Sequence, residues 1–242
     1  MAIELPDEVV QFLQFIGVNW PQVNEDSVSE FASHVREFAT NIEDTHQRAT
    51  SRIQAMGAAY QANSYELLVS KWAHLSRGHM NDLLEGCQVL ATALDAAADY
   101  IVAMKLECIG ELAVLAASFI ADQAAAVATL GIAEAAEALV IDAAEKAVDY
   151  LEQQLIQYII GQVIEAALNP LLGVIEKAVA GMTYSALEDV LGVSGSGPDA
   201  DSGFMIHPEE LRSHAQIFTH HAETVQEHAQ ALSGKISQLS FS

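Results

Sequence analysis

A strict apolar repeat near the end of the chain constrains the fold more than any other feature of the sequence. After Pro208, apolar residues alternate at spacings of four and three, which places them on one face of a long helix. A helix with one apolar face needs a partner, so it either folds back on the rest of the chain or docks on another protein. The repeat consists of Leu211, Ala215, Phe218, Ala222, Val225, Ala229, Leu232, Ile236 and Leu239.

Two further apolar seams predict a helical hairpin over residues 25 to about 105. The first seam follows Ser27-Val-Ser-Glu30, which has the pattern of a capping box at a helix start, and it stops at Gly57. The second seam begins after a short turn, and two long helices joined by such a turn fold back antiparallel. The first seam is Val28, Val35, Ile42, Ala49 and Met56, and the second is Leu68, Trp72, Leu75, Leu83, Leu90, Leu94 and Ile101.

Composition favours helix in the rest of the chain as well. The 242 residues are 51% hydrophobic and 18% charged, with only 5 Pro and 14 Gly, which indicates a folded rather than a disordered chain. Pro6 opens a short helix from Asp7 to Ile16 that ends at Gly17, and Ala-rich helices follow from about Cys108 to Leu191. We therefore predict an all-α fold: an elongated helical bundle built on a long antiparallel hairpin, with a tethered C-terminal amphipathic helix.

A Gly- and Ser-rich segment divides the chain into three parts. We expect residues 1–191 to form the hairpin and the Ala-rich bundle, and residues 192–205 to be a flexible linker. Residues 206–242 then form the C-terminal amphipathic helix.

Charge and cysteine content exclude several classes of protein. The formal net charge of −23 opposes electrostatic binding to nucleic acid or to an anionic bilayer. The acidic N-terminus, Met1 to Glu8, lacks the basic and apolar regions of a cleavable signal peptide. Cys87 and Cys108 lie 21 positions apart, about 31 Å along one continuous helix, so we expect two buried free thiols rather than a disulfide.

Catalytic and metal-binding patterns are lacking in the sequence. Glu43-Asp-Thr-His46 is a single Glu-x-x-His, whereas di-iron bundles need two such pairs and two further Glu residues. An enzyme would require a polar pocket built from residues such as His46, His74 and His79, and nothing in the sequence indicates that these converge. We therefore expect no catalytic residue, no metal site and no cofactor.

Three histidines flank the C-terminal seam at heptad spacing: His214, His221 and His228. Positions seven apart on a helix are separated by about 10.5 Å, so the three cannot share one metal ion. Protonation near pH 6 would place charge on the interface that the seam forms, which is one interpretation. The other is that they are partly solvated histidines with no switching role.

The most apolar stretch, Leu112 to Ile141, suggests an alternative function. Asp122, Glu134 and Glu137 interrupt it, so it lacks the roughly 18 to 20 uncharged residues of a spanning helix. The alternative is a membrane-active, pore-forming protein that stores this stretch and Leu155–Val190 inside a soluble bundle. Acidic side chains neutralised at low pH would then reduce the free energy of insertion.

The order helix, short turn, helix resembles the Trp-x-Gly helical-hairpin superfamily exported by type VII secretion systems. The turn here reads Tyr60-Gln61-Ala62, with Tyr in place of the family's Trp and Ala in place of its Gly. A more extensive resemblance, over roughly residues 3–192, is to the N-terminal domain of polymorphic toxins of the channel and necrotizing toxin (CpnT) type. It rests on Ile16-Gly-Val-Asn-Trp-Pro21, Glu25-Asp-Ser-Val28, Phe31-Ala-Ser-His-Val-Arg-Glu-Phe-Ala39, Ser64-Tyr65 through Trp72, and Leu112 to Ala128.

The resemblance implies a non-catalytic trafficking and partner-binding domain of a type VII-secreted, toxin-like protein. Tyr60, Ala62 and Trp72 would form the hairpin turn. The family's Tyr-x-x-x-Asp/Glu export signal has one match, Tyr184-Ser-Ala-Leu-Glu188; a Tyr packed in the core with a surface Glu is the alternative.

The resemblance also implies a partner and a location. The partner would be a small helical-hairpin protein or a second copy, together with the secretion machinery. The protein would be bacterial, cytoplasmic before export, and then secreted or held at the cell envelope without a signal peptide. We expect the partner to contact the C-terminal seam at Leu211, Phe218, Val225, Leu232 and Ile236.

Overall fold

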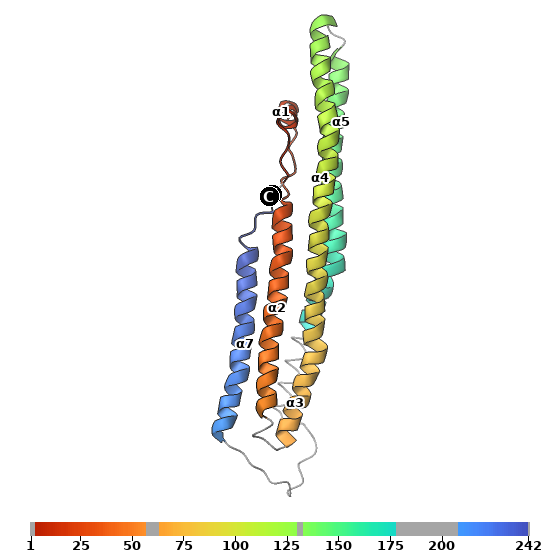
Figure 1. Ribbon diagram of the computed structural model, residues 1–242. Helices are drawn as coiled ribbons and strands as arrows, with labels where there is room; N and C mark the ends of the chain where they lie inside the picture. Colours follow the sequence, from red (N-terminus) through yellow and green to blue (C-terminus); the bar gives the residue numbers. More distant parts are fainter. Residues whose placement is uncertain (1–2, 57–62, 130–132, 178–207, 242) are drawn as a thin grey trace. The chain divides into compact units, whose positions relative to one another are not determined.

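The computed structural model describes residues 3–56, 63–129, 133–177 and 208–241, and every regular element in these ranges is helical. The prediction of an all-α fold is confirmed. Helical hydrogen bonding continues beyond the last π-helix through residue 177. The elements (Figure 1) are α1 (Asp7–Ile16), α2 (Glu25–Met56), α3 (Asn63–Leu75), the π-helix η1 (Ser76–Met80), α4 (Asn81–Thr129), α5 (Ala133–Tyr158), the π-helix η2 (Ile159–Leu168) and α7 (Pro208–Ile236).

The chain divides into two compact units, and helices α2 and α4 contribute residues to both. Unit 1 comprises Met1–Phe31, Ala93–Glu165 and Leu239–Ser242, and unit 2 comprises Ala32–Thr92 and Ala166–Gln238.

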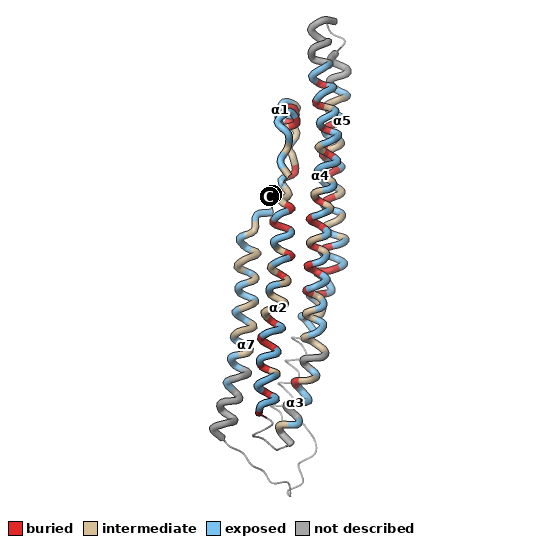
Figure 2. Tube along the Cα trace, viewed as in Figure 1, coloured by how far each residue is buried: buried red, intermediate tan, exposed pale blue. Residues whose placement is uncertain are grey.

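The heptad seam of α2 is buried, as the sequence predicts. Its members Val28, Val35, Ile42, Ala49 and Met56 are each less than 9% exposed, and Figure 2 shows buried positions recurring along α2. A repeat of seven residues returns side chains to nearly the same face of a helix, so one covered face buries all five.

In unit 2, α2 and α3 run antiparallel, as predicted for the start of the hairpin over residues 25 to about 105. The Tyr65 hydroxyl donates to the backbone carbonyl of Ile53 at 3.1 Å, and the Trp72 indole N–H donates to Thr50 Oγ1 at 2.8 Å. The residue number rises on α3 as it falls on α2, which is the antiparallel order.

Also in unit 2, α7 folds back on α2, so of the two arrangements that its apolar face allowed, the structure has the one within the same chain. Lys235 forms an ion pair with Glu37 at 2.5 Å, and His228 Nε2 lies 3.0 Å from Thr45 Oγ1. The two helices run antiparallel and side by side (Figure 1). The seam residues Val225, Leu232 and Ile236 are half-buried.

In unit 1, α4 and α5 pack antiparallel. The rings of Tyr100 and Tyr158 stack with centroids 4.1 Å apart, and Cys108 Sγ contacts the carbonyl oxygen of Ala147 at 3.7 Å. Leu112 and Leu151 are fully buried. Small alanines in the sequences of both helices allow such close packing.

Helix α1 begins and ends where the sequence predicts. Gly17, with a φ of 73° in the left-handed region, ends the helix. The backbone N–H of the next residue, Val18, donates a hydrogen bond to the carbonyl of Leu13 at 3.1 Å. Phe12 and Phe15 both contact Phe119, with ring centroids 5.4 and 5.1 Å apart.

The predicted capping box at Ser27 is wrong, because α2 begins two residues earlier, at Glu25. The cap is Asn24, whose side-chain Oδ1 accepts the backbone N–H of Ser27 at 3.2 Å. The Ser27 hydroxyl is not a cap but donates to the carbonyl of Ser240 at 2.6 Å. A contact with the far end of the chain thus replaces the local one.

The two cysteines are free and buried on the single helix α4, as predicted. Burial raises the pKa of both the Cys87 and the Cys108 thiols to about 11. Both are therefore poor nucleophiles at neutral pH.

By length and composition, one helix in the described part of the chain could cross a membrane. It is the continuous helical stretch Ala138–Lys177, of 40 residues, and most of its apolar stretch lies at the surface. Its exposed side chains include Ile156, Ile160 and Ile164, spaced four residues apart.

Candidate functional site

Trp72 anchors α3 to α2 near the end of the hairpin. Its indole N–H bonds to Thr50, and its side chain packs in a buried cluster with Ala49, Ile53 and Met56. Of the three residues predicted at the turn, Tyr60 and Ala62 lie outside the described residues. Trp72 therefore has a definite structural role, as a core residue that joins the two arms.

Two histidines from different helices meet at the face of Trp72. The His46 ring stacks on the indole with centroids 4.6 Å apart and an interplanar angle of 11°. The His221 ring, from α7, lies edge-on at 5.5 Å from Trp72 and 5.9 Å from His46. We call these three residues the His–Trp cluster; it joins α2, α3 and α7.

The surroundings of the His–Trp cluster disfavour protonation of its histidines. Burial lowers the pKa of His46, and the nearby His221 lowers it further. Burial also lowers the pKa of His221, with His220 adding to the effect. Both rings are thus held neutral at pH values at which a free histidine would be partly charged.

Of the three histidines predicted to sense pH, the structure places two at the contact between α7 and α2. His221 belongs to the His–Trp cluster, and His228 contacts Thr45. The side chain of His214 lies outside the described residues, as do those of the predicted partner-binding residues Leu211 and Phe218.

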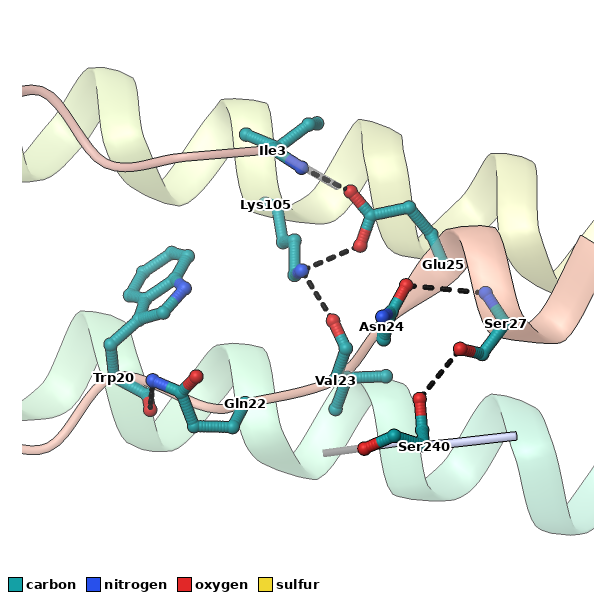
Figure 3. Close-up of polar contacts among 9 residues, drawn as sticks. All are labelled: Ile3, Trp20, Gln22, Val23, Asn24, Glu25, Ser27, Lys105 and Ser240. Atoms are coloured by element: carbon teal, nitrogen blue, oxygen red, sulfur yellow. Dashed lines mark hydrogen bonds and ion pairs between the residues drawn. The ribbon is translucent and has the colours of Figure 1, made fainter. Parts of the chain in front are cut away.

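A buried ion pair in unit 1 is the strongest polar feature that sequence reasoning missed (Figure 3). Lys105, on α4, and Glu25, at the start of α2, are paired at 2.6 Å, and both side chains are only 4% exposed. The Lys105 ammonium also donates to the carbonyl of Val23, and Glu25 accepts the backbone N–H of Ile3 at 2.5 Å. The pair therefore fastens the segment before α2 to α4.

The pKa of Glu25 reflects opposing causes. Burial raises this pKa. Hydrogen bonds from Lys105 and from the Ile3 backbone, together with the lysine charge, lower it by more than burial raises it, so the net shift is downward. Ionised Glu25 thus stabilises the folded chain above its ordinary pKa of 4.5, and this is lost as the pH falls through the lower folded value.

A signal for this pair exists in the sequence. Lys105 continues the apolar series Ile101, Cys108 and Leu112 at spacings of four, three and four, and Glu25 precedes Val28 by three. Opposite charges at seam positions indicate that each helix buries a charge, and such charges are stable when paired.

The C-terminal residues of unit 1 contact the same segment. The backbone N–H of Asn24 donates to the carbonyl of Phe241 at 3.1 Å, and Phe31 and Phe241 lie edge to face at 6.3 Å. Together with the bond from Ser27 to Ser240, these contacts place the end of the chain beside the start of α2 (Figure 3).

The remaining candidate residues do not form a reaction centre in the described ranges. His74 and His79 contact each other edge to face at 6.3 Å, whereas His46 is in the His–Trp cluster. Among described residues, no group of three or more His, Cys, Asp or Glu side chains could hold a metal ion. Tyr184 and Glu188, the predicted export signal, lie outside the described residues, as does the predicted linker 192–205.

Comparison with known proteins gives one match. A family model described as a WXG100 like domain matches residues 2–147, more than half of the chain. The matched range contains α1, the α2–α3 hairpin, α4 and the pair of Glu25 and Lys105, but not α7. No curated protein and no solved structure matches the chain.

Proposed function

The chain belongs to the WXG100-like family, and from this premise we propose that it is the non-catalytic trafficking and partner-binding part of a type VII-secreted, toxin-like protein. Membership of this family makes the chain a helical protein related to bacterial type VII secretion. The observation that carries the proposal is the match over residues 2–147, which contains the complete α2–α3 hairpin.

The toxin-like part of the proposal rests on the resemblance to the N-terminal domain of CpnT-type toxins. The segments that carry this resemblance include Ile16 to Pro21 and Glu25 to Val28, which lead into α2. A domain of this kind moves and positions a separate toxic domain, so its own activity is recognition and not catalysis.

We expect the partner to be a small helical-hairpin protein or a second copy of the chain, as WXG100 proteins typically pair or self-associate. Two surfaces support this expectation. The seam of α7 at Val225, Leu232 and Ile236 is half-buried next to α2, so a partner would reach it after α7 leaves α2. Ile156 and Ile160, 56% and 46% exposed, offer an apolar stripe to a partner helix without any such movement.

Export is the direct test of the proposed function. A tagged chain is expressed in a bacterium with an intact type VII system and in one that lacks the motor ATPase, with lysis monitored in both. Appearance in the medium only with the motor present would support the proposal. Motor-independent appearance, or retention in both hosts even when small helical-hairpin proteins of the same host are co-expressed, would contradict it.

Tyr184 and Glu188 are the residues that we propose as the export signal. The variant Tyr184→Ala should remain helical and stay in the cell, because the receptor would lose an aromatic side chain. Tyr150→Ala is a suitable control, since Tyr150 is a 56% exposed tyrosine on another helix. Normal export of Tyr184→Ala would remove this motif from the proposal.

The second candidate function is membrane insertion, which the exposed apolar stretch of Ala138–Lys177 favours. Leakage of dye from liposomes at pH 5 and at pH 7 separates the two functions. A carrier releases no dye at either pH, whereas a pore-forming protein whose carboxylates become neutral in acid releases it at pH 5.

A further inference from the structure

Helices α2 and α7 line an open pocket, and the charged side chains in its described lining are both basic. Its volume is about 110 Å³, and Ala49, a buried residue of the α2 seam, contributes an apolar wall. The polar lining comes from both helices: Thr45, Arg48 and Arg52 of α2, and His220, His221 and Thr224 of α7.

This lining is unusual for so acidic a chain. The sequence has 33 Asp and Glu residues against 10 Lys and Arg, yet two of those ten cations line one pocket and none of its described lining residues is a carboxylate. Arg48 and Arg52 lie four residues apart on one face of α2. In the described part of the chain, neither guanidinium is in an ion pair.

A buried ring nitrogen in the same lining also lacks a protein partner. Among the described residues, His221 Nδ1 is inaccessible to solvent and makes no hydrogen bond. Buried polar atoms are nearly always hydrogen-bonded, so this exception needs an explanation, and a bound water molecule or ion is one such explanation. The Thr45 hydroxyl also lies in the lining, and its proton is available to an anion when His228 Nε2, 3.0 Å away, is the donor of their hydrogen bond. The Thr224 hydroxyl instead donates to the carbonyl of His220 at 2.8 Å.

We propose that this pocket binds a phosphate group, which bridges α2 and α7. Two guanidinium groups supply planar pairs of N–H donors that match phosphate oxygens, and the Thr45 hydroxyl and the imidazoles supply further donors. A volume of about 110 Å³ leaves room for one small tetrahedral anion.

The bridge has a consequence for α7. Because the donors come from both helices, bound phosphate holds α7 against α2. The empty pocket leaves the two guanidinium groups of α2 without a counter-charge from α7 in the described lining. The site is thus independent of the proposed export function, and it would remain if that function were refuted.

The test is a titration of the full chain with inorganic phosphate at pH 7.5. The ring resonances of His220 and His221 in NMR spectra monitor the binding. Sodium chloride of equal ionic strength is the reference. We expect saturable shifts with phosphate and not with chloride. Phenyl phosphate in a parallel titration distinguishes the source: binding equal to that of inorganic phosphate identifies a phosphate ester, and exclusion of the ester identifies the free ion.

Matched variants assign the binding to the pocket. Arg48→Gln with Arg52→Gln should weaken phosphate binding at least about tenfold, because each charge-assisted hydrogen bond is worth more than a neutral one. Lys146→Gln removes one charge at an exposed position outside the pocket and should bind as the parent chain does.

Two results would overturn the proposal. One is a shift that is linear in phosphate or equal in chloride, and the other is a double variant that binds as tightly as the parent. Both arginines are exposed, so the double variant should keep its helical circular dichroism. Arg52→Gln alone, measured alongside, should show a smaller loss and keeps the test valid if the double variant misfolds.

Discussion

At the scale of single residues, Lys105 shows how a buried charge is tolerated in an apolar seam. Its ammonium is paired with Glu25 and bonded to the carbonyl of Val23, and its side chain is only 4% exposed. A single unpaired charge buried at this position would strongly destabilise the folded chain. The pair therefore contributes to stability only while both of its members are present.

Replacing Lys105 with Met should therefore destabilise the chain by about 3 kcal/mol, because it leaves the Glu25 carboxylate buried without a counter-charge. Urea denaturation followed by circular dichroism measures this loss. Lys146→Met is the control, because Lys146 pairs with Asp142 at the surface, where such pairs contribute less than about 1 kcal/mol. Similar small effects of both substitutions would show that Lys105 is solvated.

At the scale of secondary-structure elements, the docking of α7 on α2 is the feature with most consequence for partner binding. An ion pair at Lys235, a contact at His228 and the ring of His221 fix it along its length. Any binding that uses the α7 seam competes with these contacts.

A chemical cross-link can report this docking. With Thr45→Cys and His228→Cys, a short bis-maleimide reagent at pH 7 should join the two thiols within most chains, because the parent side chains are in contact at 3.0 Å. Cys87 and Cys108 should not compete, since their raised pKa leaves little thiolate. Mass spectrometry of a digest detects the bond.

The matched control for this cross-link is Thr45→Cys with Glu227→Cys, because Glu227 is an exposed neighbour on the same helix. A cross-link as frequent in the control as in the test pair would mean that α7 has no defined register on α2.

Acid should weaken the docking of α7 through the His–Trp cluster. The folded-state pKa of His46 and of His221 is lowered, so the unfolded chain binds more protons below pH 6.5, and stability falls as the pH drops from 6.5 toward the folded values. The groups that add repulsion to the cluster are basic: His221 acts on His46, and His220 acts on His221. Arg48 and Arg52 of α2 line the adjoining pocket, and α3 contributes the uncharged Trp72.

We expect a lower urea midpoint at pH 5.5 than at pH 7.5 in phosphate-free buffer. The variant His221→Gln should show a smaller difference between the two pH values. His74→Gln, at an exposed position outside the cluster, should keep the full difference. An unchanged difference in His221→Gln would mean that other groups, such as the carboxylates, cause the acid sensitivity.

At the scale of the whole molecule, the net charge of −23 should be visible in the salt dependence of stability. Like charges repel more strongly in the compact state, and the Debye length falls from about 30 Å at 0.01 M salt to about 8 Å at 0.15 M. Adding sodium chloride over this range should therefore raise the melting temperature by a few degrees. A fall on adding salt would show that attractive ion pairs outweigh the repulsion.

The family assignment belongs to this scale as well. The hairpin fold was predictable from the seams of α2 and of the helix that returns from it, and the resemblance to type VII hairpins agrees with the family match over residues 2–147. Membership of the CpnT type, the partner and the export signal remain proposals that export and binding experiments test.

The features that the sequence alone was enough to predict are local. The bounds of α1, the burial of the α2 seam from Val28 to Met56 and the two free thiols all depend on spacing along one helix, and periodicity reports which face of a helix is apolar. Periodicity does not report which other helix covers that face.

The features that only the tertiary structure decided all join residues far apart in the chain. They are the pair of Lys105 with Glu25, the bond of Ser27 to Ser240, and the contact of His221 with Trp72. Each depends on which helices pack together and in what register, which is a property of the whole set of apolar faces. A local pattern such as Ser-x-x-Glu loses to such contacts because burying an apolar face stabilises the chain by more than one cap does.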